Sequence, residues 1–229
     1  MDYNSRSSLE RRKTLNIFSS INSNLIFMLP GLLLGLTVHE FAHAWVAKRY
    51  GDLTAYFEGR VTLNPFAHID PVGLICLVFF RFGWGRPVPI SPRNFRKPIE
   101  AQIAVGLAGI IANIITMFCV AIIYGLLLRF APAIALNQYV SMIISACISY
   151  NAALAVFNLL PLPPLDGYNV LKQILPYDMA RHLVNIDMRT SWIILMALSW
   201  TGIIGRIITP IIYFIQGLGF NLVYLLAGL

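Results

Sequence analysis

The run from residue 101 to residue 128 carries no charged side chain, since the nearest charges are Glu100 and Arg129. A helix over this run is about 42 Å long at about 1.5 Å per residue, which exceeds the ~30 Å hydrocarbon core of a bilayer. The stretches 139–160 and 190–229 are similarly apolar, and the second of them holds one charge, Arg206. The sequence therefore predicts an all-α polytopic membrane protein with about four to six membrane helices.

Charged residues make up only 12% of the 229 residues, about half the share found in soluble domains. The bilayer is therefore the solvent that fits the whole chain, and no stretch has the polar composition of a separate soluble module. We expect a single domain over residues 1–229, in an integral, multi-pass protein of the cell membrane.

The formal net charge of +7 comes from basic residues that lie between the apolar runs. Arg93, Arg96 and Lys97 crowd one connection, as expected of positive charges that flank membrane helices. Nucleic-acid binding is not expected, because no basic patch alternates with aromatic residues for base stacking. Basic residues flank both ends of the first apolar run, so they do not fix the orientation of the N-terminus. Nothing in the sequence sets an oligomeric state.

The chain divides into segments of different character. They are a polar, basic segment expected at the membrane surface (1–16), an apolar helix (24–50), a connection (54–92), two spans (101–128 and 139–160), a proline-rich break (161–167) and a C-terminal membrane segment (190–229). In the connection, strand-forming residues around Glu58-Gly59 predict a hairpin over 53–64. The stretch 72–80 is apolar but too short to span, which predicts a re-entrant or interfacial segment. The prolines and glycines of Gly83–Pro92 predict extended chain.

Breaks and caps refine these segments. Pro30 could mark a re-entrant turn in the first apolar run, and Gly51-Asp52 reads as the end of its helix. A short amphipathic helix is expected over about 167–175. Thr209-Pro210 divides the C-terminal segment, which is either one long kinked helix or two shorter ones.

His39-Glu40-Phe41-Ala42-His43 is the motif that carries chemistry. Residues four apart lie on one face of a helix with Cβ atoms about 6 Å apart, so both imidazoles can reach one zinc ion. Glu40 can then reach the water that zinc binds. Ionisable residues that end an apolar run at membrane depth are costly, which favours a functional role over a solvated surface.

A catalytic zinc site needs a third protein ligand and an open position for water. The candidates are Asp52, Glu58, His68, Asp70 and Asp166. Asp52 and Glu58 lie in connections where a solvated carboxylate is ordinary. Asp166 follows a proline-rich break after a span, and non-helical backbone at membrane depth is tolerated where it lines a cavity or is buried in protein. We favour Asp166 as a ligand, and the alternative is an N-cap for the following helix.

The sequence resembles the site-2 protease family of intramembrane metalloproteases. The matching motifs occur in the expected order over more than half of the chain: His39-Glu40-Phe41-Ala42-His43, Asn64-Pro65 with His68-Ile69-Asp70-Pro71, Pro87-Val88-Pro89, and Asn158-Leu159-Leu160-Pro161 running into Leu165-Asp166-Gly167. The resemblance implies that one Zn²⁺ ion per chain is bound by His39, His43 and Asp166. It also implies that Glu40 is the general base and that Asn158 is a polar group near the scissile carbonyl.

Other parts of the resemblance concern supporting residues. Gly109 and Asn113 resemble the family's small-residue motif in the intervening span, although Ile110 stands where a proline is often found. His68 and Asp70 recur in the family without binding metal, which implies that they fix a loop or support the ligands. No segment resembles the PDZ or nucleotide-binding domains of many members, so a minimal membrane core is expected.

The resemblance implies a zinc-dependent intramembrane endopeptidase whose partners are the lipid bilayer and membrane proteins with a transmembrane segment. Zinc lowers the pKa of its bound water toward 7, and Glu40 would pass the proton to the leaving amine. A helical substrate must unwind locally, and residues 54–63 and Gly83–Pro92 could pair with it as an added strand. A membrane transporter or channel and an inactive zinc-binding relative are the alternatives, and the intact Glu40 argues against the inactive relative.

Overall fold

The computed structural model describes residues 3–80, 83–176, 178–180 and 187–229, with side chains from Ile26 onward except at 77–80, 188, 189 and 192. Helices dominate, and the described part of the chain contains no strand. In chain order they are α1 (Tyr3–Arg49), α2 (Thr54–Phe57), η1 (Pro65–Ala67), α3 (Pro71–Phe80), η2 (Pro92–Asn94), α4 (Pro98–Phe130), α5 (Pro132–Ala135), α6 (Gln138–Asn158), α7 (Asp166–Ile174), α9 (Met188–Trp200) and α10 (Ile203–Ala227).

Four of the described helices are long and apolar enough to cross a membrane: residues Ile26–Arg49 of α1, and the whole of α4, α6 and α10. Their outer faces are apolar as well. On α4, for example, Ile111 and Ile115 are more than half exposed. Such a surface suits lipid rather than water. The prediction of an all-α polytopic membrane protein is confirmed.

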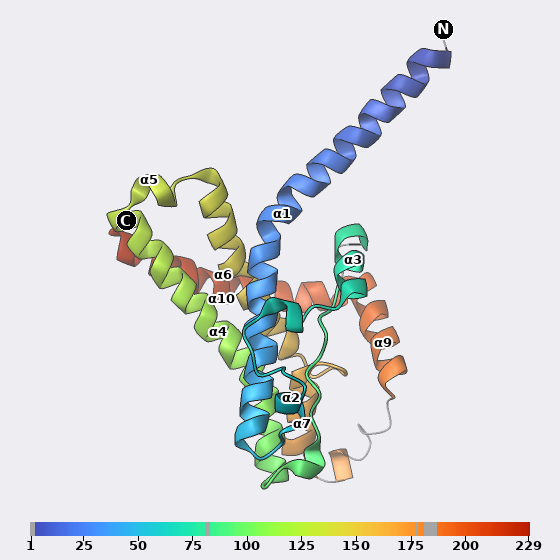
Figure 1. The fold of residues 1–229 in the computed structure, drawn as a ribbon, viewed down its shortest axis with the longest axis vertical. Helices are drawn as coiled ribbons and strands as arrows, with labels where there is room; N and C mark the ends of the chain where they lie inside the picture. Colours follow the sequence, from blue (N-terminus) through green and yellow to red (C-terminus); the bar gives the residue numbers. More distant parts are fainter. Residues whose placement is uncertain (1–2, 81–82, 177, 181–186) are drawn as a thin grey trace.

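The spanning helices form one bundle, with α4 and α6 between α1 and α10. α1 packs against both α4 and α6, which also contact each other, while α10 packs on the far side of α4 and α6 (Figure 1). Small and aliphatic side chains fill the contact of α4, α6 and α10. They are Met117, Ala121, Ile148, Ala152 and Val223, all nearly or fully buried. This packing fixes the relative positions of the helices that carry the polar residues of the site.

α1 continues through Pro30 without the re-entrant turn that the sequence left open. It ends at Arg49, and Gly51 follows with φ of +104°, a conformation that glycine adopts without steric cost. The predicted helix stop at Gly51 is therefore confirmed. The side chains of the basic N-terminal segment lie outside the described side chains, so its position at the membrane surface stays a prediction.

The predicted hairpin over 53–64 is wrong. Residues Thr54–Phe57 form the short helix α2, and Gly59 continues the chain in a turn with φ of +68°. The cause is the preceding carboxylate: Asp52 accepts hydrogen bonds from the backbone N–H and the hydroxyl of Thr54, which starts a helical turn. This local side-chain turn outweighs the strand propensity of Tyr56 and Phe57.

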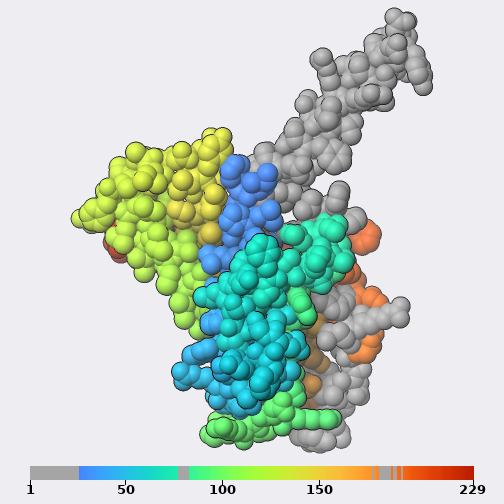
Figure 2. Space-filling model, viewed as in Figure 1, coloured from blue at the N-terminus to red at the C-terminus, as the bar shows by residue number. Residues whose placement is uncertain are grey.

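The extended prediction for Gly83–Pro92 is confirmed over residues 83–91, named the strap below. Gly85 in the strap forms an isolated antiparallel bridge with Ile69, and the Arg86 N–H donates to the carbonyl of His68 at 2.8 Å. Arg60 donates from its guanidinium to the carbonyls of Arg86 and Pro87. Residues from about 50 to 76 cover one face of α1 (Figure 2). The connection after α1 thus folds back over the helix that carries the zinc motif.

Two short helices lie where the sequence predicts them, and the C-terminal segment needs one correction. The short helix α7 (Asp166–Ile174) occupies the place of the expected amphipathic helix, and α3 is short, as expected for 72–80. The C-terminal segment forms two helices, but the break lies at Gly202, with φ of +72°, and not at Thr209-Pro210. Pro210 is accommodated inside α10.

Candidate active site

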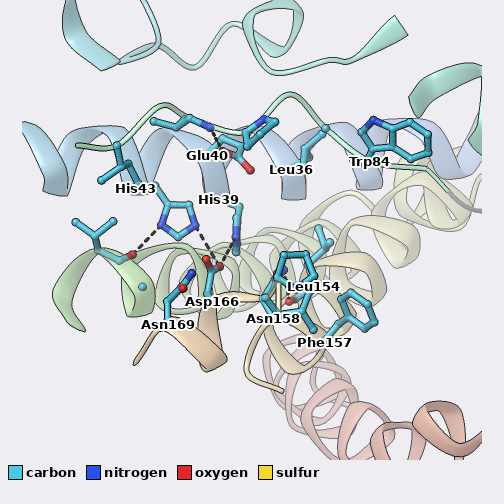
Figure 3. Close-up of a pocket in the computed structure, with 18 of the residues that line it drawn as sticks. Leu36, His39, Glu40, His43, Trp84, Leu154, Phe157, Asn158, Asp166 and Asn169 are labelled. Atoms are coloured by element: carbon cyan, nitrogen blue, oxygen red, sulfur yellow. Dashed lines mark hydrogen bonds and ion pairs between the residues drawn. The ribbon is translucent and has the colours of Figure 1, made fainter. Parts of the chain in front are cut away.

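The zinc motif and the predicted third ligand come together in space. His39 and His43 lie on α1 with about 5% of their surface exposed, and Asp166 is the first residue of α7. Asp166 Oδ2 lies 2.9 Å from His39 Nε2 and 3.2 Å from His43 Nε2. Figure 3 shows both imidazoles directed at this carboxylate. In the described part of the chain, this is the one group of three potential metal ligands whose atoms all lie within 4.8 Å of one another.

The three residues fit a zinc ion. Ligand atoms about 2.0–2.1 Å from a tetrahedral zinc lie about 3.3 Å from each other, close to the two Nε2–Oδ2 distances here. The Nδ1 of His43 lies 2.7 Å from the carbonyl of Val105, which can only accept, so this nitrogen carries the proton. His43 Nε2 is then free to bind a metal. Two nitrogens and one carboxylate are the ligand set of a catalytic zinc site with an open position.

One stripe of α4 holds both imidazoles. Val105, Gly109 and Asn113 are spaced four apart, and they face His43 and His39 on α1. The Val105 carbonyl accepts from His43, and the Asn113 Oδ1 lies 2.7 Å from His39 Nδ1. A Cβ at Gly109 would lie 2.5 Å from the His39 ring, so only glycine lets this ring approach α4. The resemblance of Gly109 and Asn113 to a family motif thus acquires a physical reason.

α7 reaches the site through a close turn after α6. A Cβ at Gly167 would lie 2.2 Å from the carbonyl oxygen of Leu159, so the turn needs glycine at this position. Asp166 does not cap the helix, because the N-cap is Leu165 and no side-chain capping bond is formed. The carboxylate instead faces the histidines, which disfavours the alternative interpretation as an N-cap.

Glu40 lies on the other side of the histidines, toward the strap. Its Oε2 accepts a hydrogen bond of 2.9 Å from the backbone N–H of Val88 (Figure 3). A backbone donor therefore fixes one oxygen of the carboxylate, and the other oxygen is left for a proton transfer. This is the arrangement that a general base needs.

Asn158 ends α6 and lines a cavity that His39, Glu40, His43 and Asp166 also line. One proton of its amide nitrogen is donated to the carbonyl of Leu154 at 3.0 Å. An amide carries two such protons, so the second is left for a group in the cavity. The structure thus brings Asn158 into the cavity without placing it among the three candidate ligands.

Asp52 contradicts the expectation of a solvated carboxylate, because it is completely buried. Besides Thr54, it accepts from the Ser91 backbone N–H at 2.6 Å and from the Asn94 amide at 2.9 Å. Burial by itself raises the pKa of Asp52, but these hydrogen bonds outweigh it and hold the pKa below its ordinary value. Asp52 therefore ties the end of α1 to α2 and to the end of the strap, and it does not belong to the group of candidate metal ligands.

The other candidates for a third ligand also lie outside the cluster. Glu58 is exposed, and the buried His68 places its Nε2 2.9 Å from the carbonyl of Thr62, which fixes that loop. Asp70 accepts from the backbone N–H groups of Val72 and Gly73 at the start of α3. The Gly73 bond is the main cause of a lowered pKa of Asp70. These positions agree with the loop-fixing role expected for His68 and Asp70.

Three contacts of the site were not predicted. Two of them are backbone groups, the Val105 carbonyl and the Val88 N–H, which no residue type reveals in a sequence. The third is the buried amide of Asn151 on α6, which lies 3.0 Å from the amide of Asn113. A polar residue inside an apolar span is the signal that could have identified Asn151.

A cavity of about 1000 Å³ opens onto these residues. Its polar lining includes His39, Glu40, His43, Asn158 and Asp166, and apolar side chains from α1 and α6 form much of the remaining wall. Such a cavity can admit both water and a stretch of apolar chain. It meets the requirements of a hydrolytic site within a membrane protein.

No family model and no solved structure matches the chain. Among curated proteins it is 40% identical over 156 residues to "Putative zinc metalloprotease YwhC" of Bacillus subtilis, across 66% of this chain and 69% of that protein. It is 31% identical over 192 residues to "Putative zinc metalloprotease Rip2" of Mycolicibacterium smegmatis, across 82% of this chain and 72% of that protein. A protein of the same description from Methanocaldococcus jannaschii is 30% identical across 68% of this chain and 76% of its own length. The chain therefore belongs to the family of zinc metalloproteases that these relatives are named for.

Proposed function

We propose that this protein is a zinc-dependent endopeptidase that hydrolyses peptide bonds in or near transmembrane segments of other membrane proteins. The observation that carries the proposal is the convergence of His39, His43 and Asp166 on one point inside the bundle, with Glu40 on the same helix. Both histidines lie in the membrane-spanning part of α1. This location supports a substrate bond in or beside the bilayer.

The chemistry follows from the positions of the side chains. His39, His43 and Asp166 would hold a zinc ion, which would supply a Lewis acid and lower the pKa of bound water. Glu40 takes a proton from the attacking water on its free oxygen, while its other oxygen stays bonded to the Val88 N–H. It then gives the proton to the amine that leaves. In this proposal Asn158, which lines the cavity and has one amide proton bonded to the Leu154 carbonyl, donates its second amide proton to the developing oxyanion.

The strap supports a substrate in extended form. It runs past Glu40, it is not helical, and Pro87 and Pro89 prevent it from joining a helix. An unwound substrate segment can lie between the strap and the apolar cavity wall and pair with the carbonyl groups that the strap offers. Residues 54–57 no longer qualify for this pairing, because they form α2.

The test combines metal analysis with cleavage by the purified protein. We expect one zinc ion per wild-type chain, cleavage of at least one member of a panel of single-span membrane proteins, and loss of zinc in His39→Ala and His43→Ala. Glu40→Gln should keep its zinc and lose cleavage, because an amide cannot accept the proton. Equal zinc in the wild type and both histidine variants would refute the site.

The two alternatives are separated by the same samples. An inactive zinc-binding relative would bind zinc and cleave nothing in the panel. A transporter would also cleave nothing and would move an ion or solute across vesicles. Cleavage that survives in Glu40→Gln would refute the mechanism while leaving the metal site intact.

A further inference from the structure

Two asparagine side chains lie inside the spanning part of the bundle. Asn113 on α4 and Asn151 on α6 are both fully buried. An unpaired amide is costly in such a place, and these two are paired with each other and with the backbone. Together they connect three spanning helices, α1, α4 and α6.

The direction of each hydrogen bond is fixed, starting from α6. Asn151 places its Nδ2 2.8 Å from the carbonyl of Cys147, which can only accept, so the Oδ1 of Asn151 must face Asn113. Asn113 therefore presents its nitrogen. That nitrogen has a second acceptor, the carbonyl of Gly35 on α1, at 2.9 Å. Both amide protons of Asn113 are then used.

The remaining polar atom of Asn113 is its Oδ1, which faces the candidate ligand His39. This oxygen lies 2.7 Å from His39 Nδ1, and because an amide oxygen only accepts hydrogen bonds, His39 must carry its proton on Nδ1. His39 Nε2 is then unprotonated and directed at Asp166, 2.9 Å away. If Asn113 turned over, its nitrogen would face His39 and favour the tautomer that cannot bind a metal through Nε2.

We propose that Asn151 is a positioning residue for the metal centre, which acts through Asn113 to fix the tautomer and ring orientation of His39. The proposal rests on the metal site of the proposed function. Asn151 does not contact His39 itself. Its oxygen accepts one of the two amide protons of Asn113 and so opposes the reversed orientation of that amide. Without Asn151, only the hydrogen bond to the Gly35 carbonyl would oppose the reversal.

His43 provides an internal contrast. Its Nδ1 lies against the carbonyl of Val105, a backbone group that cannot turn over. The tautomer of His43 is therefore fixed without any side chain. Only the His39 half of the site depends on side-chain amides, so loss of Asn151 should disturb one ligand and leave the other in place.

The experiment measures metal binding by the full chain in detergent. Zinc affinity is obtained by competition with a chelator, and cobalt(II) in place of zinc gives an absorption spectrum that reports the ligand geometry. Removal of residues that orient metal ligands typically weakens metal binding about 10- to 100-fold. We expect Asn113→Leu to fall in this range, and Asn151→Leu to weaken zinc binding about 10-fold and to change the cobalt spectrum.

The double variant distinguishes this role from a general packing role. If Asn151 acts through Asn113, then Asn113→Leu/Asn151→Leu should bind zinc as weakly as Asn113→Leu alone. Independent packing defects would instead multiply the two losses, which would overturn the proposal. Gln216→Leu is the matched control: Gln216 donates to the Ser149 carbonyl on α6, away from His39, and its loss should leave zinc binding unchanged.

Folding is checked by helical circular dichroism, and Asn151→Ala replaces Asn151→Leu if the larger side chain is not accommodated. Unchanged zinc affinity and an unchanged cobalt spectrum in the folded Asn151 variant would overturn the proposal and leave the metal site standing. A wild-type chain that binds no zinc would overturn both.

Discussion

Gly109→Ala tests how closely the metal site is fitted to α4. The added Cβ would lie 2.5 Å from both Cε1 and Nδ1 of His39 and 2.7 Å from Nε2. Ordinary contacts between such atoms begin at about 3.5 Å, so the ring must retreat by about 1 Å. The ring cannot retreat freely, because Asn113 and Asp166 hold its two nitrogens at 2.7 and 2.9 Å.

The expected effects on stability and on the site differ in size. Replacing glycine by alanine within a helix stabilises it by about 1 kcal/mol, whereas overpacking costs about 1–3 kcal/mol, so the net loss of stability is about 0–2 kcal/mol. A retreat of about 1 Å stretches at least one hydrogen bond of His39 beyond the useful range. Misplacement of this size at a catalytic group lowers the rate about 100-fold. Gly109→Ala should therefore fold and lose function.

The assay compares zinc affinity, cleavage rate and thermal stability of Gly109→Ala with those of Gly219→Ala. Gly219 is a buried glycine of α10 whose added Cβ would meet its nearest atom at 3.4 Å, an ordinary contact. We expect this control to keep zinc and activity. Full zinc affinity and full cleavage by Gly109→Ala would refute the argument that the His39 ring is held against α4.

Three further substitutions test other parts of the structure. Asp166→Asn should lose zinc and cleavage, because the neutral amide is a poor metal ligand; an active, zinc-replete variant would exclude Asp166 as the third ligand. Val88→Pro removes the N–H that holds Glu40, so cleavage should fall about 10-fold with zinc retained, while Val88→Ala serves as the control. Asp52→Asn should destabilise the fold by about 1–3 kcal/mol at neutral pH, since an amide oxygen replaces two acceptor oxygens. Because the pKa of Asp52 is lowered in the folded protein, the greater stability of the wild type should persist above about pH 4 and shrink as the pH falls through the pKa of the folded state. A difference in unfolding midpoint between the wild type and Asp52→Asn that stays constant down to about pH 2 would contradict this expectation.

Much of the architecture is local in origin, and local features are readable from a sequence. The uncharged runs predict α4 and α6 because a bilayer-spanning helix satisfies its own backbone and needs only apolar side chains. The i, i+4 spacing of His39 and His43 fixes their common face without any tertiary information. Asp166 could be favoured over its rivals because its proline-rich surroundings imply a break at membrane depth.

The predictions from the sequence were wrong mainly where residues distant in the chain decide the local structure. Asp52 reads as a surface carboxylate until Ser91 and Asn94, some forty residues later, are known to donate to it. The same residue starts α2 and so removes the hairpin that the strand propensity of the following residues predicts. Pro210 reads as the C-terminal break, yet the helix continues through it and the turn occurs at Gly202.

The site and the packing of α1 against α4 specify each other. Three groups on α1 are spaced four residues apart: the Gly35 carbonyl, His39 and His43. On α4 they face Asn113, Gly109 and Val105 respectively, so the two helices run in opposite directions along this contact. A slide of α4 by one turn, about 5.4 Å, would bring a bulkier residue against the His39 ring and leave the amide of Asn113 without the Gly35 carbonyl. Since an unpaired amide inside the membrane is costly, the register that assembles the three ligands is also the register that satisfies the buried polar groups. Substitutions along this stripe should therefore alter metal binding and helix packing together, whereas substitutions of the exposed Ile111 and Ile115 of α4 should alter neither.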